Sequence, residues 1–164
     1  MTDQWFVKLL DKKDDFLRRG QELKWFPERM AKNYEDWVSG LKWDWCISRQ
    51  RYFGVPFPVW YCKKCGEIIL ADEKDLPVDP SEIMPAGEKC SKCGGNEFIP
   101  EPDVMDTWMT SSLTPAIAAK LFPDEKTQKK LYPMSLRPQA FEIIRTWLFY
   151  TIVKSHYHDN QLPF

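Results

Sequence analysis

Apolar side chains recur at intervals of three and four residues in the first quarter of the chain, a pattern that favours amphipathic helices. Asp14 to Leu23 predicts a first helix, in which Gly20 weakens the C-terminal end. Arg29 to Leu41 predicts a second helix. Its apolar positions share one face, which we expect to be buried: Met30, Tyr34, Trp37, Val38 and Leu41.

Two further helices are predicted in the C-terminal third. Thr110 to Phe122 forms one of them, with Ser111 or Ser112 available as its N-cap. The longest helical pattern runs from Leu136 to Tyr157, and Pro138 suits its first turn, where no backbone donor is needed. The apolar-facing positions of this pattern are Phe141, Ile144, Trp147, Leu148, Thr151 and Ile152.

Short apolar runs between the helices predict strands. The candidates are Gln4 to Leu10, Leu23 to Phe26 and Trp43 to Ser48, and we expect the first and third to be buried. Phe53 to Tyr61 contains two prolines and predicts extended chain with one edge strand, because proline cannot donate to a sheet ladder. This mixture of strands and helices predicts the α/β class.

The composition fits one globular domain, or one domain with a small satellite. The chain has 164 residues, of which 43% are hydrophobic, and it includes 8 Trp and 10 Phe, so general disorder is excluded. A formal net charge of -1 argues against a domain that coats nucleic acid, although it permits a local basic groove. The sequence contains neither a G-x-G-x-x-G motif nor a P-loop.

We expect a cytoplasmic protein with no membrane partner. The N-terminal residues do not lead into a long apolar run, as a secretory signal would. The longest apolar stretch, Trp147 to Val153, is far shorter than the ~20 residues that span a bilayer. In a reducing compartment, paired cysteines act more often as metal ligands than as disulfides.

Four of the five cysteines form two C-x-x-C-G sequences: Cys62, Cys65, Cys90 and Cys93. A two-residue gap lets both thiolates of a pair face one ion, and the glycine permits the tight turn that follows. Four thiolates complete a closed tetrahedral Zn²⁺ site, which is structural rather than catalytic. Two disulfides or four free thiols are the alternatives. Because residues 62–100 are poor in large apolar side chains, we expect an inserted zinc module that folds with its metal.

Cys46, His156 and His158 are weaker candidates for chemistry. Cys46 lies in an apolar run with no evident base, which favours a buried, inert thiol over a nucleophile. The two histidines lie at the polar end of the last predicted helix, which favours a solvated pair over a metal site.

Two blocks flank the cysteine segment. Residues 43–56 read W-D-W-C-I-S-R-Q-R-Y-F-G-V-P, a strand that ends in a polar cluster and an aromatic pair. Residues 102–112 read P-D-V-M-D-T-W-M-T-S-S, with two carboxylates, a tryptophan and hydroxyls before a helix. Proteins of the α/β class bind ligands where strand ends meet helix starts. An ordinary strand-loop-helix with solvated charges is the alternative.

Both blocks resemble signatures of the class I aminoacyl-tRNA synthetases for branched aliphatic amino acids. The first resembles W-C-I-S-R-Q-x-x-x-G-x-P-x-P, and the second resembles D-V-x-D-T-W-x-x-S-S, of which Asp106-Thr107-Trp108 is the valyl-type form. Residues 137–147, R-P-Q-A-F-E-I-I-R-T-W, resemble the helix start G-x-D-I-I-x-x-W in a form like that of archaeal valyl enzymes. The resemblance is collinear over nearly the whole chain.

The resemblance implies the second half of a Rossmann-like catalytic domain, of α/β class, with an inserted zinc knuckle. Residues 1–61 would follow the editing insertion, residues 62–100 would bind zinc, and residues 101–164 would complete the catalytic portion. The implied parent is a valine–tRNA ligase that uses ATP, Mg²⁺, valine and tRNA(Val). The sequence contains no His-Ile-Gly-His and no Lys-Met-Ser-Lys-Ser motif, so we expect an internal fragment that is inactive alone.

The same resemblance implies an amino-acid pocket. Phe53, where the family usually has Trp, would line it together with Val104 and Trp108. Plain core packing is the alternative for the two aromatic residues.

The resemblance also implies contacts to nucleotide and tRNA. Glu142, where the family usually has Asp, would accept hydrogen bonds from the ribose hydroxyls of the adenylate, with Gln139 and Ala140 beside it. Stabilisation of the helix dipole is the alternative for Glu142. Arg49 and Arg51 would contact the tRNA acceptor end or cap a strand.

Two other assignments stay open. An isoleucyl or leucyl relative is the nearer one. The other is a zinc-ribbon module that binds nucleic acid or protein without chemistry, but such a module would not need three collinear blocks outside its cysteines.

Overall fold

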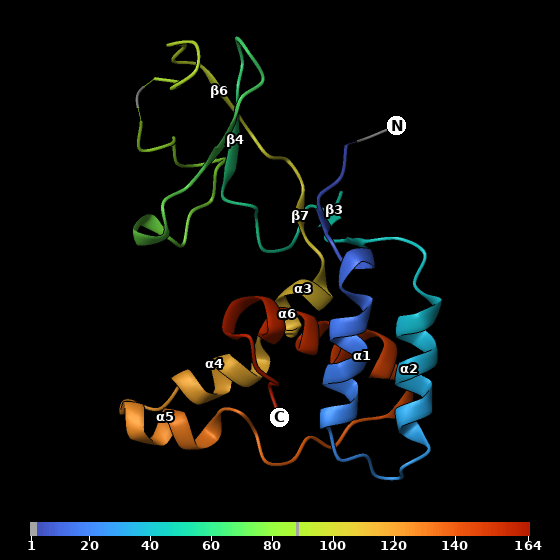
Figure 1. Ribbon diagram of the computed structural model, residues 1–164. Coiled ribbons are helices and arrows are strands. Elements are labelled where there is room, and N and C mark those ends of the chain that lie inside the picture. The colour runs from blue at the N-terminus through green and yellow to red at the C-terminus, as the bar shows by residue number, and fades with distance from the viewer. Residues whose placement is uncertain (1–2, 88) are drawn as a thin grey trace. The chain divides into compact units, whose positions relative to one another are not determined.

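The computed structural model describes residues 3–87 and 89–164, which divide into two compact units (Figure 1). Residues 3–47 and 107–164 form the helical unit, and residues 48–106 form the sheet unit. Helices and short sheets are both present, so the expected mixture of the two is confirmed. Within residues 3–87 and 89–164 every strand pair is antiparallel. No helix in these described residues is long and apolar enough to cross a membrane.

The two helices predicted near the N-terminus are confirmed to within one residue at each end. The 3-10 turn η1 (Leu10–Lys12) leads into α1 (Lys13–Glu22), and α2 (Met30–Gly40) follows a loop. The apolar faces meet each other and the C-terminal helix. The fully buried side chains at this contact are Phe16, Tyr34, Val38 and Phe149.

Gly20 allows α1 and α2 to approach closely. A Cβ atom at Gly20 would lie 2.3 Å from Cε1 of Tyr34, so a larger residue would collide with the ring. The Tyr34 hydroxyl donates to the carbonyl of Phe16 at 2.9 Å, and the Trp25 indole donates to the carbonyl of Gly20 at 2.8 Å. The residue expected to weaken α1 therefore has a packing role.

A break divides the helix predicted over residues 110–122. The structure has α3 (Thr107–Ser111) and α4 (Thr114–Lys120), with Leu113 as the N-cap of α4 and no side-chain capping bond. The predicted cap at Ser111 or Ser112 is therefore wrong. A further helix, α5 (Glu125–Leu131), was not predicted from the apolar pattern.

The last helix begins later than predicted. It starts with a 3-10 turn, η3 (Phe141–Ile143), continues as a π-helical turn, η4 (Ile144–Leu148), and becomes regular in α6 (Phe149–Asp159). The start predicted at Leu136 is wrong, and Pro138 lies outside the helix in irregular chain.

Two short strands connect the start of the helical unit with the residues after α2. β1 (Phe6–Val7) pairs with β2 (Trp45–Cys46), whose Trp45 ring stacks on Tyr150 at a centroid distance of 3.8 Å. The strand predicted over residues 43–48 is interrupted at Ile47, and only its last residue, Ser48, belongs to the sheet unit. The strand predicted over residues 23–26 is wrong, because that segment is an irregular loop.

The sheet unit contains five strands and one 3-10 turn among its described residues. β4 (Val59–Cys62) lies between β5 (Ile68–Leu70) and β6 (Phe98–Pro100), so the predicted edge strand is wrong in its position. Both prolines of the run precede β4, which leaves its backbone donors available. β3 (Ser48–Arg49) pairs with β7 (Val104–Met105), and η2 (Glu73–Asp75) lies beyond β5.

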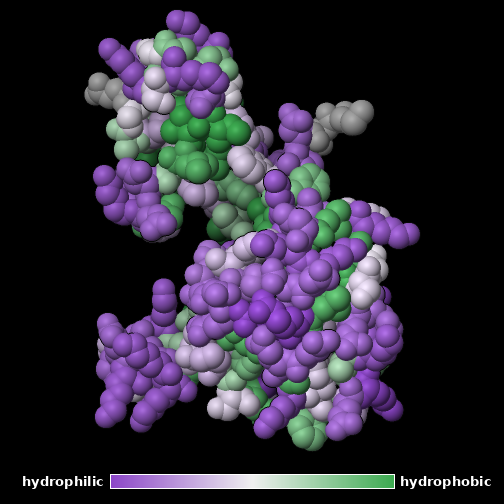
Figure 2. Space-filling view, in the orientation of Figure 1, coloured by the Kyte–Doolittle hydropathy of each residue, from purple (hydrophilic) through white to green (hydrophobic). Residues whose placement is uncertain are grey.

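Trp60 anchors the long connection of the sheet unit. Its ring is 2% exposed, and its indole N–H donates to the carbonyls of Pro80 and Ile83 at 3.2 and 3.0 Å. Hydrophobic side chains gather on the visible face of this unit (Figure 2). The exposed apolar side chains on its three-stranded sheet are Ile68, Leu70 and Ile99.

Candidate functional site

The four paired cysteines come together in the sheet unit. The Sγ atoms of Cys62, Cys65, Cys90 and Cys93 all lie within 4.8 Å of one another. Cys62 and Cys93 are 3.5 Å apart at Sγ, and Cys65 and Cys90 are 3.7 Å apart. Tetrahedral Zn²⁺ with Zn–S bonds of about 2.3 Å requires S···S distances of about 3.8 Å. The donor set could therefore hold one tetrahedral ion with small adjustments.

The two cysteine turns repeat the same backbone hydrogen bonds. In the first turn Gly66 N–H donates to the carbonyl of Cys62 at 2.8 Å, and in the second Gly94 N–H donates to that of Cys90 at 2.8 Å. Both glycines have left-handed backbones, with φ of 72° and 69°. Residues that carry a side chain rarely adopt this backbone conformation, which explains the glycine after each second cysteine.

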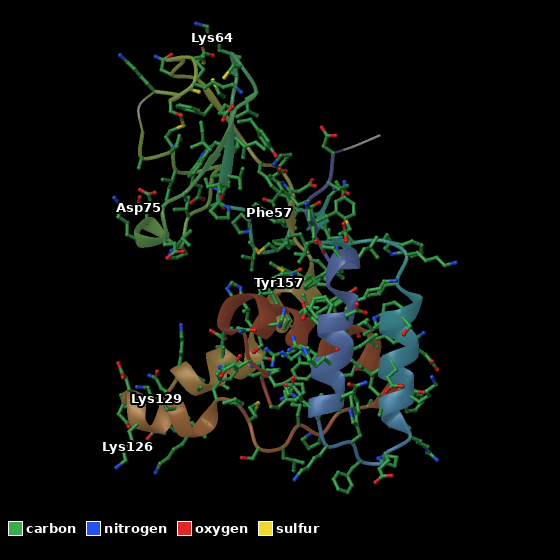
Figure 3. All side chains as sticks on the ribbon, viewed as in Figure 1. Phe57, Lys64, Asp75, Lys126, Lys129 and Tyr157 are labelled. Carbon is green, nitrogen blue, oxygen red and sulfur yellow. The ribbon has the colours of Figure 1, made fainter. Side chains whose placement is uncertain are left out.

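The surroundings of the first turn shift its two thiols in opposite directions. Burial raises the pKa of the Cys62 thiol, but hydrogen bonds with the backbone N–H groups of Cys65 and Lys64 and with the thiols of Cys93 and Cys65 together lower it by more, to about 7. The backbone N–H of Glu67 lowers the pKa of Cys65, but hydrogen bonds with neighbouring thiols and burial raise it by more, to about 12. Lys64 itself lies at one end of the sheet unit (Figure 3). Thiolates are the form that binds metal.

Two ion pairs each join a lysine of one cysteine turn to a glutamate that follows the other turn. Lys63 in the first turn lies 2.7 Å from Glu97, and Lys92 in the second lies 2.6 Å from Glu67. The carboxylates raise the pKa of both lysines. Because all four side chains are substantially exposed, the pairs contribute little stability.

Polar residues from the two flanking blocks meet inside the sheet unit. The amide of Gln50 donates to Oδ2 of Asp103 at 2.6 Å, and the Arg49 guanidinium lies 3.2 Å from Oδ1 of Asp106. Glu101, between β6 and β7, accepts the N–H of Asp103 at 2.9 Å. Glu101, Asp103 and Asp106 are 9%, 8% and 3% exposed. The alternative of solvated charges is therefore wrong for Asp103 and Asp106, the two carboxylates of the second block.

Val104 and Phe53 differ in their surroundings. Val104 is buried, and its side chain lies so close to Gly54 that a Cβ atom there would be 2.5 Å from Cγ2 of Val104. Phe53 is 84% exposed and meets only the neighbouring ring of Tyr52 edge-on, at a centroid distance of 4.8 Å, among the aromatic contacts of the described residues. Phe53 therefore lies outside the buried core of the described residues.

Trp108, the other aromatic residue assigned to the pocket, belongs to the helical unit. It is half-buried in α3, and its carbonyl accepts the N–H of Ser112 at 3.0 Å. Its place relative to Phe53 and Val104 stays a prediction.

The residues assigned to the adenylate lie near η3 in the helical unit. Glu142 is exposed and lines a depression of about 440 Å³ together with Asn33, Asp36, Trp37, Phe141 and Arg145. Ala140 is the exposed N-cap of η3. Gln139 is half-buried, and its Oε1 atom is buried without a hydrogen-bond partner in the described part of the chain.

The two arginines assigned to tRNA differ in their contacts and exposure. Arg49 is engaged by Asp106 and donates to the carbonyl of Ser48 at 2.7 Å. Arg51 is exposed, in an exposed stretch that runs from residue 51 to 55.

The weaker candidates have ordinary structural partners. Cys46 is half-buried, and its thiol donates to Gln4 at 3.4 Å. His156 accepts a hydrogen bond from Arg19 at 3.4 Å and meets the Phe16 ring edge-on, whereas His158 is exposed. Among the residues that the structure describes, the four cysteines form the one group suited to a metal ion.

The buried contacts of Gln50, Asp103 and Asp106 were not assigned from the sequence. Their only sequence signal was the carboxylate spacing D-x-x-D after a segment of prolines. Nothing in that spacing indicates which distant residue each carboxylate meets.

The whole chain matches a known family of enzymes. Residues 1–164 match the family model described as tRNA synthetases class I (I, L, M and V). The valine–tRNA ligase of Thermoplasma volcanium is 56% identical over 160 residues, which cover 98% of this chain and 20% of that protein. The valine–tRNA ligases of Orientia tsutsugamushi and Methanopyrus kandleri are 53% and 50% identical and cover 99% and 100% of this chain. The chain spans about one fifth of the length of these relatives.

A solved structure resembles the fold. The leucyl-tRNA synthetase agnB2 LeuRS of Agrobacterium radiobacter K84, crystallised as a ternary complex with tRNA and LeuAMS, matches with a TM-score of 0.54 and 28% identity. The match covers 72% of this chain and 17% of that one.

Proposed function

Because the chain belongs to the class I tRNA synthetases, we propose that it is part of an enzyme that activates valine with ATP and transfers it to tRNA(Val). The observation that carries this proposal is the identity of 50–56% with valine–tRNA ligases over at least 98% of the chain. The chain would supply the second half of a Rossmann-like catalytic domain, with residues 62–100 inserted between residues 1–61 and 101–164. A cytoplasmic location follows from the presence of tRNA there.

Phe53, Val104 and Trp108 are the proposed walls of the valine pocket. The exposure of Phe53 supports this role, because an exposed ring is free to meet a ligand. Val104 is fixed by its contact with Gly54, so it would give the pocket a rigid floor. A pocket of this kind rejects a side chain that lacks one methylene by only ~1–3 kcal/mol, and it rejects an added hydroxyl weakly.

Glu142, Gln139 and Ala140 are the proposed contacts to the adenylate. Glu142 is exposed at the edge of a depression, where its carboxylate can accept hydrogen bonds from two ribose hydroxyls. Gln139 offers a buried oxygen that lacks a partner within the described residues. No general acid or base is required, since adenylate formation depends on positioning and on charge stabilisation.

We assign the tRNA contact to Arg51. Its exposed guanidinium is available to a phosphate. Arg49 is the last residue of β3, and its ion pair with Asp106 favours the other role considered for it, which is to cap a strand.

The four cysteines are the proposed ligands of one structural Zn²⁺. Their chemistry and spacing fit the ion, and the two matching turns leave no position open for substrate. When bound, the ion would join the two cysteine turns. ATP and Mg²⁺ would bind the whole enzyme.

Amino-acid-dependent exchange of pyrophosphate into ATP tests the proposal in the full-length synthetase that contains this chain. We expect kcat/KM for valine to exceed the values for isoleucine, leucine and threonine. A preference for isoleucine or leucine would replace the assignment by one of those enzymes. Absence of exchange with all four amino acids, in a preparation that is folded, would exclude a synthetase of this group.

A further inference from the structure

α3 is too short to hold its own position. It contains five residues, from Thr107 to Ser111, and isolated helices of this length are not stable in water. The helix nevertheless carries Trp108, the proposed pocket wall. Its position must therefore be fixed by contacts with other segments.

Hydroxyl side chains close the end of α3. Those of Thr110 and Ser112 each donate to the carbonyl three residues earlier, at 2.9 and 2.8 Å. The hydroxyl of Thr114 donates to the carbonyl of Ser111 at 2.8 Å. These local bonds compete with continued helix and end α3, but they do not connect it to the core.

A long-range hydrogen bond from Trp147 connects the end of α3 to the core. The indole N–H of Trp147 donates to the carbonyl of Ser111 at 3.1 Å, across 36 residues of sequence. The Trp147 side chain is 5% exposed and lies within η4. A π-helical turn shifts the side chains that follow it around the helix axis, and such turns occur often at functional sites.

The Trp147 ring is itself held on its faces. The guanidinium carbon of Arg137 lies 3.7 Å from the ring centroid, and the Phe164 ring stacks nearly parallel to it, at 6.1 Å and an interplanar angle of 17°. The Nε atom of Arg137 is buried without a hydrogen-bond partner among the described residues. These contacts fix the direction of the indole N–H toward α3.

We propose that Trp147 is a positioning residue that sets the place of Trp108 through the carbonyl of Ser111, and so sets the preference of the enzyme for valine. The proposal rests on the proposed function, in which Trp108 lines the amino-acid pocket. Trp147 does not contact substrate. Its loss would loosen the pocket without changing the nucleotide site.

The test is Trp147→Phe in the full-length synthetase, measured by pyrophosphate exchange. Phenylalanine keeps an aromatic ring but removes the indole donor. We expect KM for valine to rise and the ratio of kcat/KM for valine over isoleucine to fall roughly fivefold, the effect of one neutral hydrogen bond. KM for ATP stays unchanged. A loss of folded enzyme cancels in the ratio, so the ratio separates positioning from stability.

Trp45→Phe is the matched control. Trp45 is also buried in the helical unit, but its indole nitrogen has no hydrogen-bond partner among the described residues. We expect the ratio to stay at the wild-type value. If Trp147→Phe changes the ratio no more than this control does, the proposal is overturned.

Arg137→Gln covers the case in which Trp147→Phe does not fold. It removes the guanidinium from the ring and leaves the indole bond in place. We expect a fall of roughly twofold in the same ratio, and an unchanged ratio would overturn the proposal. A wild-type enzyme that does not prefer valine would instead contradict the proposed function.

Discussion

Asp44 shows how one carboxylate fixes the start of the helical unit. It accepts hydrogen bonds from the backbone N–H groups of Leu9 and Leu10, at 2.7 and 3.1 Å. The two donors belong to the turn before α1, whereas Asp44 directly precedes β2. The bonds to Leu9 and Leu10 lower the pKa of Asp44 from its usual 3.8.

Asp44→Ala should destabilise the chain by about 1 kcal/mol, because two backbone donors lose their acceptor. Since the folded-state pKa of Asp44 is lowered, this stabilisation is present above the unfolded pKa and is lost as the pH falls through the folded pKa. Urea unfolding at pH 7 and near pH 3 measures the difference. The exposed Glu28 serves as control, and Glu28→Ala should cost little at either pH. A difference that is equal at both pH values would contradict this assignment.

Trp108 gives the residue-scale prediction on specificity. Trp108→Ala in the full-length synthetase enlarges the proposed pocket, and each added methylene that fits contributes ~0.8 kcal/mol. We expect the ratio of kcat/KM for valine over isoleucine to fall several-fold. An unchanged ratio in folded enzyme would make Trp108 a packing residue and leave the family assignment intact.

Among the elements, α1 and α2 depend on their close approach at Gly20. Gly20→Ala would force a methyl group against the Tyr34 ring, and overpacking of this kind costs about 1–3 kcal/mol. Gly40→Ala is the matched control at the end of α2, because a Cβ atom at Gly40 meets nothing within 4 Å. We expect that control to be neutral or stabilising by about 0.5–1 kcal/mol. Equal effects in urea unfolding would show that helix propensity, not packing, decides both.

At the scale of elements, the two cysteine turns are expected to hold one Zn²⁺ between them. The purified chain should contain one Zn²⁺, and Cys90→Ser should lower the zinc content and unfold much of the sheet unit. Cys46→Ser should leave the zinc content unchanged, since Cys46 lies in the helical unit. Elemental analysis measures both. A metal-free chain with two disulfides by mass, prepared without chelator, would contradict the assignment.

The sequence pattern predicted helices well where the apolar residues of a single helix face determine the structure. The bounds of α1 and α2 follow from apolar residues at helical spacing. The break after α3 did not follow, because Ser112 and Thr114 bond to carbonyls three residues earlier, which propensity does not indicate. The two prolines before β4 led to the wrong prediction of an edge strand, because they lie outside the strand itself.

In the candidate site, too, contacts between residues close in sequence were predictable and long-range contacts were not. The cysteine cluster was predictable because each pair is local and the ion requires both pairs. The bonds of Gln50 to Asp103 and of Trp147 to Ser111 span 53 and 36 residues. Such pairings depend on the tertiary fold, so residue spacing does not reveal them.

At the scale of the whole molecule, the chain spans about one fifth of the length of the valine–tRNA ligases that it matches. The sequence contains neither of the two motifs that handle ATP phosphates in the family. The sheet unit contains the four cysteines, and the helical unit contains the residues assigned to the adenylate. If the proposed function is correct, we expect activity in the full-length protein and none in this chain alone.

Charging of purified tRNA by the full-length synthetase tests this central claim most directly. With labelled valine, we expect tRNA(Val) to be aminoacylated and tRNA(Ile) and tRNA(Leu) to remain uncharged. Stable charging of tRNA(Ile) with isoleucine or of tRNA(Leu) with leucine, and none of tRNA(Val) with valine, would contradict it.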